Sequence, residues 1–203
     1  MGAEQISGRG DASDTLAALR ASLGIEDVRL GVGASAGMVV GLVAALLEEI
    51  ARSSGDGWPE AGGAIAQATA LRRRSLRLAR ADAAAYAEGR DALLSLSTRG
   101  PTEEGDVPGL TEALNRAAEV PLQIAEAATD AVTLAALIAE RAKYDLRADA
   151  AGAACLASGA TAAATHLVEV NLATQAPDER LGRARELVSL SRAASERALA
   201  ASA

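Results

Sequence analysis

The sequence predicts an all-α protein, an antiparallel bundle of five or six alanine-rich helices. Half of its 203 residues are hydrophobic, whereas aromatic residues make up only 1%. No stretch alternates apolar and polar residues as a half-buried strand would, and β-branched residues are sparse. Short connections rich in glycine and proline separate segments with helical spacing. Small side chains bury little apolar area per helix, so we expect a homodimer.

Capping residues and helix breakers divide the chain into these helices. The first three helices are expected to end at Gly24, at the glycines 55 and 57, and at the loop 99–108, respectively. Pro177 suits the first turn of the last helix. Pro121 is expected to kink or restart its helix because proline lacks a backbone donor. The predicted ranges are 13–23, 34–53, about 60–97, 110–143, about 148–174 and 178–200. We expect residues 1–12 to be a flexible N-terminus and 13–203 a single helical domain.

Charge and composition exclude several classes of protein. A net charge of -7 argues against a nucleic-acid partner, which needs a broad basic face. Cys155 is the only cysteine, and no leader peptide is visible, which favours a cytoplasmic location. The apolar run 31–47 is shorter than the roughly 20 residues that cross a membrane, so we expect a core helix. One histidine and no carboxylate cluster predict no bound metal.

The segment from 146 to 170 places an acid where its spacing predicts a buried hydrocarbon. Asp149 is the only polar member of a series with steps of three and four, which puts all its members on one helix face. A carboxylate on a packed face is costly unless it is paired, hydrogen-bonded or protonated, so Asp149 is a candidate for chemistry. The other members are Leu146, Ala153, Leu156, Ala160, Ala163, Leu167 and Val170.

The long helix before residue 97 repeats this pattern. Asp82 shares a face with Leu71 and Leu78, and Tyr86 lies one turn further along. A buried aspartate is suited to moving protons, because desolvation raises its pKa toward the working range. The alternative is that Asp82 pairs with an arginine of a neighbouring helix and only fixes the packing.

A run of small residues, 31–37, leads into the second predicted helix. Free amides at a helix start attract a carbonyl or an anionic group, and Ser35 lies near the cap. The alternative is that the glycines only permit close packing. The run is neither a Walker motif nor a dinucleotide fingerprint, since it lacks the closing Lys and a preceding strand.

Taken together, these landmarks resemble the cyclodeaminase/cyclohydrolase family. Members share a glycine-rich start before an Ala/Gly-rich helix, an Asp with an aromatic residue four positions later, a Val-Pro-Leu helix start, an Asp opening the next long helix, and an Asn-Leu ending it. The matching residues here are Gly31 to Ser35, Asp82 with Tyr86, Val120-Pro121-Leu122, Asp149, and Asn171-Leu172. The resemblance covers about 31–192.

The chain departs from the family pattern at several positions of the expected folate site. Only Gly33 and Ser35 remain of the glycine motif, and Ala148 stands where the family has serine. A basic stretch is replaced by residues 53–58, and Ala142-Lys143 replaces Gly-Asn. Arg72 to Arg74 or Lys143 are candidates to supply the missing cations for a glutamate tail.

The resemblance implies a one-carbon folate enzyme, either a methenyltetrahydrofolate cyclohydrolase or a formiminotetrahydrofolate cyclodeaminase, with a tetrahydrofolate derivative as substrate and no metal. It implies general acid/base catalysis by Asp82 and Asp149 in one shared hollow. Substrate-binding residues would be Gly33, Ser35, Tyr86, Lys143 and Asn171. Two alternatives remain: the same scaffold acting on another imine or amidine, and a catalytically silent helical dimer.

Overall fold

The computed structural model confirms an all-α bundle. It describes residues 17–18, 21, 31–97, 110–173 and 178–203. Within that part it contains five long helices and no strand. They are α2 (Val32–Ser53), α3 (Ala61–Ser97), α4 (Leu110–Arg141), α5 (Arg147–Leu172) and α6 (Glu179–Ser202), with one-turn helices η1 (Gly55–Gly57) and η2 (Tyr144–Leu146). The predicted N-terminal tail and most of the predicted helix 13–23 lie outside the described residues.

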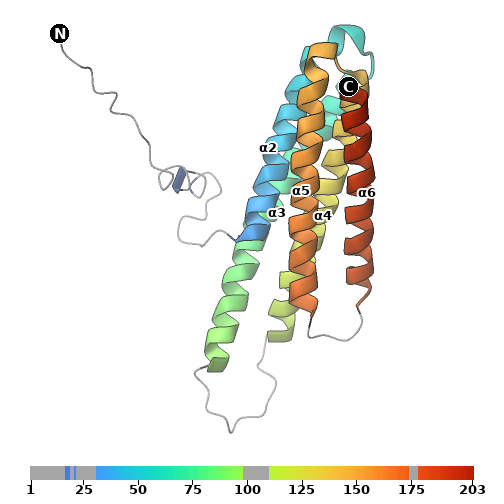
Figure 1. Cartoon of the computed structure of the whole chain (residues 1–203). Helices are drawn as coiled ribbons and strands as arrows, with labels where there is room; N and C mark the ends of the chain where they lie inside the picture. The colour runs from blue at the N-terminus through green and yellow to red at the C-terminus, as the bar shows by residue number, and fades with distance from the viewer. Residues whose placement is uncertain (1–16, 19–20, 22–30, 98–109, 174–177) are drawn as a thin grey trace, which may run out of the picture.

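The helices run antiparallel along one long axis (Figure 1). α4 lies at the centre, since it contacts each of the other four. Its sequence explains this position: 11 of the 16 residues from 124 to 139 are buried Ala, Val, Leu or Ile, so α4 is apolar on more than one side. Pro121 lies inside α4, which continues through it as one helix. The boundaries of α2 to α6 agree with the prediction to within a few residues.

Glycines set the distance between α2 and α3. A Cβ added at Gly37 would lie 3.2 Å from the backbone of Ala79, and one at Gly41 would lie 3.1 Å from a methyl group of Leu76. The two backbones are therefore in close contact at Gly37, and at Gly41 the Leu76 side chain fills the space that a Cβ would take. This contact fixes which residues of α3 face the first turn of α2, and so positions the candidate site.

Three helical segments are long and apolar enough to cross a membrane by length and composition alone. They are Val32–Ser53, Asn115–Arg141 and Tyr144–Leu172, whose most apolar windows are 56%, 72% and 50% buried inside the bundle. The segment 31–47 does form a core helix, because most of its length packs against α3, α4 and α5. The absence of a membrane-spanning helix stays a prediction.

Candidate functional site

Asp82 is a buried carboxylate beside the first turn of α2. Only 7% of the residue is exposed. Its side chain reaches from α3 across the backbone of Gly33, so closely that a Cβ at this position would overlap the carboxylate. The amide of Ala34 donates a hydrogen bond to it. The prediction of an inward-facing Asp82 is therefore confirmed, and the glycine at 33 is needed to make room for it.

The surroundings of Asp82 favour its protonated form. Burial raises its pKa from the ordinary value of 3.8 to about 6, and the bond from the Ala34 amide opposes this rise only in part. Among the residues that the structure describes, no arginine or lysine forms an ion pair with it. The alternative of a structural Asp–Arg pair is thus not supported. A carboxyl with this pKa can accept or donate a proton near neutral pH.

The start of α2 brings the other predicted residues of this region to Asp82. Ser35 donates from both its amide and its hydroxyl to the carbonyl of Gly31, at 3.1 Å and 2.9 Å. A Cβ placed on Gly31 would lie 3.9 Å from the Asp82 carboxylate and 4.0 Å from the ring of Tyr86. Tyr86 is 43% exposed. The small-residue turn, the carboxylate and one aromatic ring therefore form one cluster.

Two departures from the family pattern have no steric effect on this cluster. Val32 is 57% exposed, so its side chain points away from the bundle. Ala34 is buried, but what it provides to Asp82 is its backbone N–H, which any residue except proline has. Sequence reasoning identified the turn and missed the specific donor, since amide direction depends on where α3 lies.

Asp149 does not join this cluster, and its predicted burial is wrong. It lies in the first turn of α5 and is exposed. Leu156, which lies two turns further along the same face, is exposed as well. The buried face of α5 is instead formed by residues such as Ala150, Ala157 and Val168. In a helix made largely of alanine, two faces satisfy the same apolar spacing, so spacing alone selected the wrong one.

The two aspartates lie near opposite ends of α2. Asp82 faces the first turn of α2. The chain just before α5 contacts the C-terminal end of α2, where the Lys143 amide donates a hydrogen bond to Ser54 Oγ at 3.2 Å. Ser54 follows Ala34 by 20 positions, which is about 30 Å at a rise of 1.5 Å per residue. The hollow expected to be shared by Asp82 and Asp149 therefore does not exist within one chain. Lys143 is exposed at the same distant end.

Asn171 has a structural partner. Its side-chain amide donates to the backbone carbonyl of Ala117. In a regular helix that carbonyl would accept from the amide four residues on, but this residue is Pro121, which has none. Asn171 therefore satisfies the acceptor that the proline leaves free. This contact holds α5 to α4 and explains an asparagine here without a ligand.

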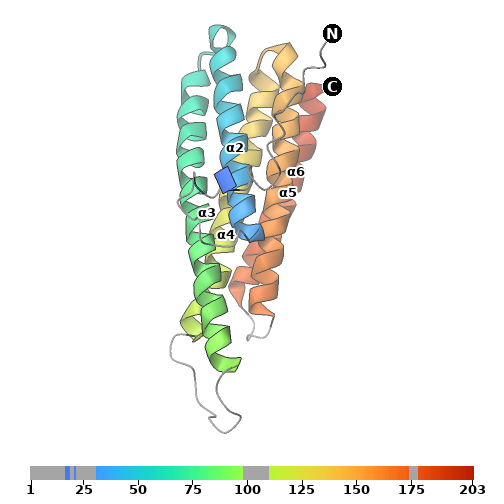
Figure 2. The ribbon, with the colours of Figure 1, turned by 90° about the vertical axis from the view of Figure 1, so that its left-hand side faces the viewer.

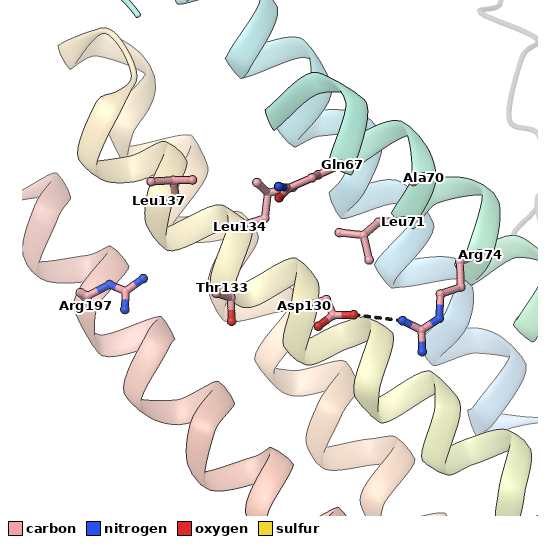
Figure 3. Close-up of a pocket in the computed structure, with 9 residues that line it drawn as sticks. All are labelled: Gln67, Ala70, Leu71, Arg74, Asp130, Thr133, Leu134, Leu137 and Arg197. Carbon is pink, nitrogen blue, oxygen red and sulfur yellow. Dashed lines mark hydrogen bonds and ion pairs between the residues drawn. The ribbon is translucent and has the colours of Figure 1, made fainter. Parts of the chain in front are cut away.

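A surface groove of about 620 Å³ lies elsewhere, between α3, α4 and α6 (Figure 3). Leucines line its floor, and the Arg74–Asp130 ion pair, at 3.0 Å, closes one side. Of the residues singled out in the sequence it contains only Arg74, one of the candidate cations for a glutamate tail, and Arg74 is paired there with Asp130. Within the described part of the chain, no group of three or more His, Cys, Asp or Glu side chains is arranged to hold a metal ion.

Comparisons with known proteins identify the family and the fold of the chain. The sequence model of the formiminotransferase-cyclodeaminase family matches residues 15–186. A solved structure, formiminotetrahydrofolate cyclodeaminase from Thermotoga maritima, superposes with a TM-score of 0.75 at 20% identity over 95% of this chain and 96% of that one. No curated protein matches by sequence. Because the family model covers most of its length, the chain belongs to the formiminotransferase-cyclodeaminase family.

Proposed function

We propose that this protein is a one-carbon folate enzyme that closes or opens the methenyl bridge of tetrahydrofolate, as a cyclohydrolase or a cyclodeaminase. The family supports the class of substrate. The observation on which the reaction depends is Asp82, a buried carboxyl with a pKa of about 6 and no cationic partner among the described residues. Both reactions pass through a cationic amidine-like carbon and move protons, and one such carboxyl suits both tasks.

In hydrolysis, the oxygen of water bonds to the methenyl carbon while the Asp82 carboxylate accepts one of its protons. The carbon–nitrogen bond then breaks to leave a formyl group on one nitrogen. The other nitrogen takes the proton held by Asp82, and the second water proton passes to solvent. Before attack, the ionised Asp82 also stabilises the delocalised positive charge of the substrate.

In deamination, a ring-closing nitrogen attacks the carbon of the protonated formimino group, and ammonia leaves from the resulting tetrahedral centre. Asp82 accepts the proton of the attacking nitrogen and returns one to the departing nitrogen. In either direction the amides of Val32 and Gly33, in the first turn of α2, would hold a carbonyl edge of the pterin. The Ser35 hydroxyl gives its own proton to the Gly31 carbonyl, so its oxygen would accept a hydrogen bond from an N–H of the substrate. Tyr86, which is partly exposed beside Gly31, would pack against the ring.

The test is the substitution Asp82→Asn, assayed by the loss of methenyltetrahydrofolate absorbance and by ammonia release from the formimino form. General acid/base catalysis is worth about 10²–10⁴-fold, so we expect a loss of that size in kcat. Asp149→Asn is the matched control, because it makes the same substitution at an exposed aspartate that lies about 30 Å from Asp82 in the same chain. An Asp82→Asn enzyme as active as the wild type would end the assignment.

The second candidate is another imine or amidine as substrate. It is favoured by the loss of the basic stretch at 53–58, where the structure shows η1 with Gly55 and Gly57 exposed. Thermal shift measurements distinguish the two, because a ligand that binds only the folded state raises the melting temperature. Stabilisation by folates supports the first proposal, and stabilisation by simple amidines alone supports the second. Stabilisation by neither would favour a silent helical dimer.

A further inference from the structure

The groove between α3, α4 and α6 takes no part in the proposed function. Figure 2 shows α4 behind α2, between α3 on the left and α6 on the right. All residues that line the groove belong to α3, α4 and α6, so it opens on the side of α4 that faces away from α2. Its volume of about 620 Å³ lies within the range of small-molecule sites.

The groove is also distant from the candidate active site. Leu71, on the floor of the groove, precedes Asp82 in α3 by 11 positions. At a rise of 1.5 Å per residue this is about 16 Å along the helix. A small ligand in the groove therefore does not reach Asp82, and its binding does not depend on the proposed function.

Leucines from two helices form the floor of the groove. Leu71 of α3 and Leu134 of α4 are mostly buried in the bundle, and each presents a small part of its side chain to the groove. Leu137, one turn further along α4, is 38% exposed. An aliphatic chain that lies on these side chains gains about fourfold in affinity for each methylene that it buries.

The charged residues of the lining leave one cation available, at one end of the groove. Arg74 pairs with Asp130 at 3.0 Å and with Glu126 at 3.4 Å, so its charge is neutralised by α4. Arg197 borders the other end (Figure 3) and pairs with Glu140 through Nε, at 3.0 Å. Its side chain is 54% exposed, and a guanidinium has further N–H donors for a second carboxylate.

We propose that the groove binds an unbranched aliphatic carboxylate of about eight carbons. Its carboxylate pairs with Arg197, and its chain lies on Leu137 and Leu134 and points toward the Arg74 end. Glu140, the partner of Arg197, follows Asp130 by ten positions in α4, which is about 15 Å. An extended chain of eight carbons is roughly 10 Å long, so it fits between the two ends.

The charge of the lining favours an anion over other amphiphiles. The lining contains two arginines and one aspartate, a net charge of +1 in a chain of net charge -7. A cationic amphiphile would meet Arg197 and would find Asp130 already paired with Arg74. A neutral alcohol would gain the same apolar contacts without the ion pair. No residue of the lining is aromatic, which suits a flexible chain better than a flat ring.

The first experiment locates the ligand by NMR, with the leucine methyl groups labelled and sodium octanoate as the probe. The signals of Leu71, Leu134 and Leu137 should shift together, with a dissociation constant of about 0.1–1 mM. Leu42 and Leu156 are the controls, because they are exposed on other helices. Equal shifts at these two leucines, or no shift in the groove at about 10 mM octanoate, would overturn the proposal.

Three substitutions of exposed residues test the ion pair. Arg197→Gln should weaken octanoate binding about tenfold or more. Arg192→Gln is the matched control, since Arg192 is exposed on the same helix outside the groove, and it should leave the affinity unchanged. Glu140→Gln should tighten binding about threefold or more, because it releases Arg197 from its partner. Arg197→Gln with wild-type affinity, or Glu140→Gln with weakened affinity, contradicts the assigned carboxylate contact.

A ligand series separates the contribution of the chain from that of the charge. Butanoate keeps the carboxylate and lacks four methylenes, so it should bind about tenfold more weakly or worse. Octylamine keeps the chain and reverses the charge, and it should not shift the groove leucines. Butanoate that binds as tightly as octanoate would show that the leucine floor takes no part. Octylamine that binds there as tightly as octanoate would show the same of Arg197, and either result overturns the proposal.

Discussion

Replacing Asp82 by asparagine is expected to stabilise the protein at neutral pH, by an amount that depends on pH. The pKa of Asp82 is raised from 3.8 to about 6 by burial, so the folded state binds this proton more tightly than the unfolded state does. At 1.36 kcal/mol per pH unit, the ionised carboxylate lowers the free energy of unfolding by about 3 kcal/mol above pH 6. This cost is present above the folded pKa and disappears as the pH falls below about 4.

An asparagine cannot ionise, but its oxygen can still accept the hydrogen bond from the Ala34 amide. The Asp82→Asn protein should therefore be more stable than the wild type by up to about 3 kcal/mol at pH 8 and equally stable near pH 4. For a chain of this length that is about 6–12 °C in melting temperature. Urea unfolding followed by circular dichroism at pH 4–8 measures this difference. Subtracting the free energies of unfolding of the two proteins at each pH cancels the contributions of all other titrating groups.

The control is Asp149→Asn, which removes one exposed carboxylate and should change stability by less than about 0.5 kcal/mol at each pH. If the difference between Asp82→Asn and the wild type is the same at pH 4 and pH 8, then Asp82 is not a buried group with a raised pKa. The basis of the proposed function would be lost with it.

Three further substitutions test the packing that positions the site. Gly33→Ala places a methyl group into the Asp82 carboxylate and should cost about 1–3 kcal/mol in urea unfolding, less when Asp82 is also alanine. Gly89→Ala, at a helical glycine with open space around it, should instead stabilise α3 by about 0.5–1 kcal/mol, so a similar loss at both positions would refute the steric argument. Asn171→Leu should cost about 1–3 kcal/mol because it leaves a carbonyl without a donor, and the cost should shrink in a Pro121→Ala background, where the helix regains its own N–H. Equal costs in both backgrounds would contradict that explanation.

Much of the fold could be predicted from local signals. Glycine, proline and capping residues interrupt the chain at nearly the positions where α2 to α6 begin and end. The burial of Asp82 was also predictable, because α3 has a strongly polar side, with arginines at 73, 77 and 80, that must face solvent. When charged residues show which side of a helix faces solvent, they also show that the opposite side is buried.

Asp149 shows where this reasoning fails. α5 has no charged residue between 150 and 168, so nothing in its sequence distinguishes the side that faces the bundle from the side that faces away. Apart from Asp149, the series through Leu156 is as apolar as the series through Ala157 and Val168. Only the second series is buried throughout, whereas in the first Asp149, Leu156 and Val170 are exposed. The choice depends on where α2, α4 and α6 lie around α5.

By itself, then, the sequence determined the helices, their order and the inward direction of Asp82, because these follow from local propensity and from the contrast between charged and apolar sides. Three features were decided by the tertiary structure alone. The Asp82 carboxylate packs against the backbone of Gly33 and accepts a hydrogen bond from the Ala34 amide. Asn171 donates to the carbonyl that Pro121 leaves without a donor, and Asp149 lies about 30 Å from Asp82 in the same chain. Each of these depends on how far one helix is shifted and rotated against another, and side chains as small as alanine leave that choice to the packing of the whole bundle.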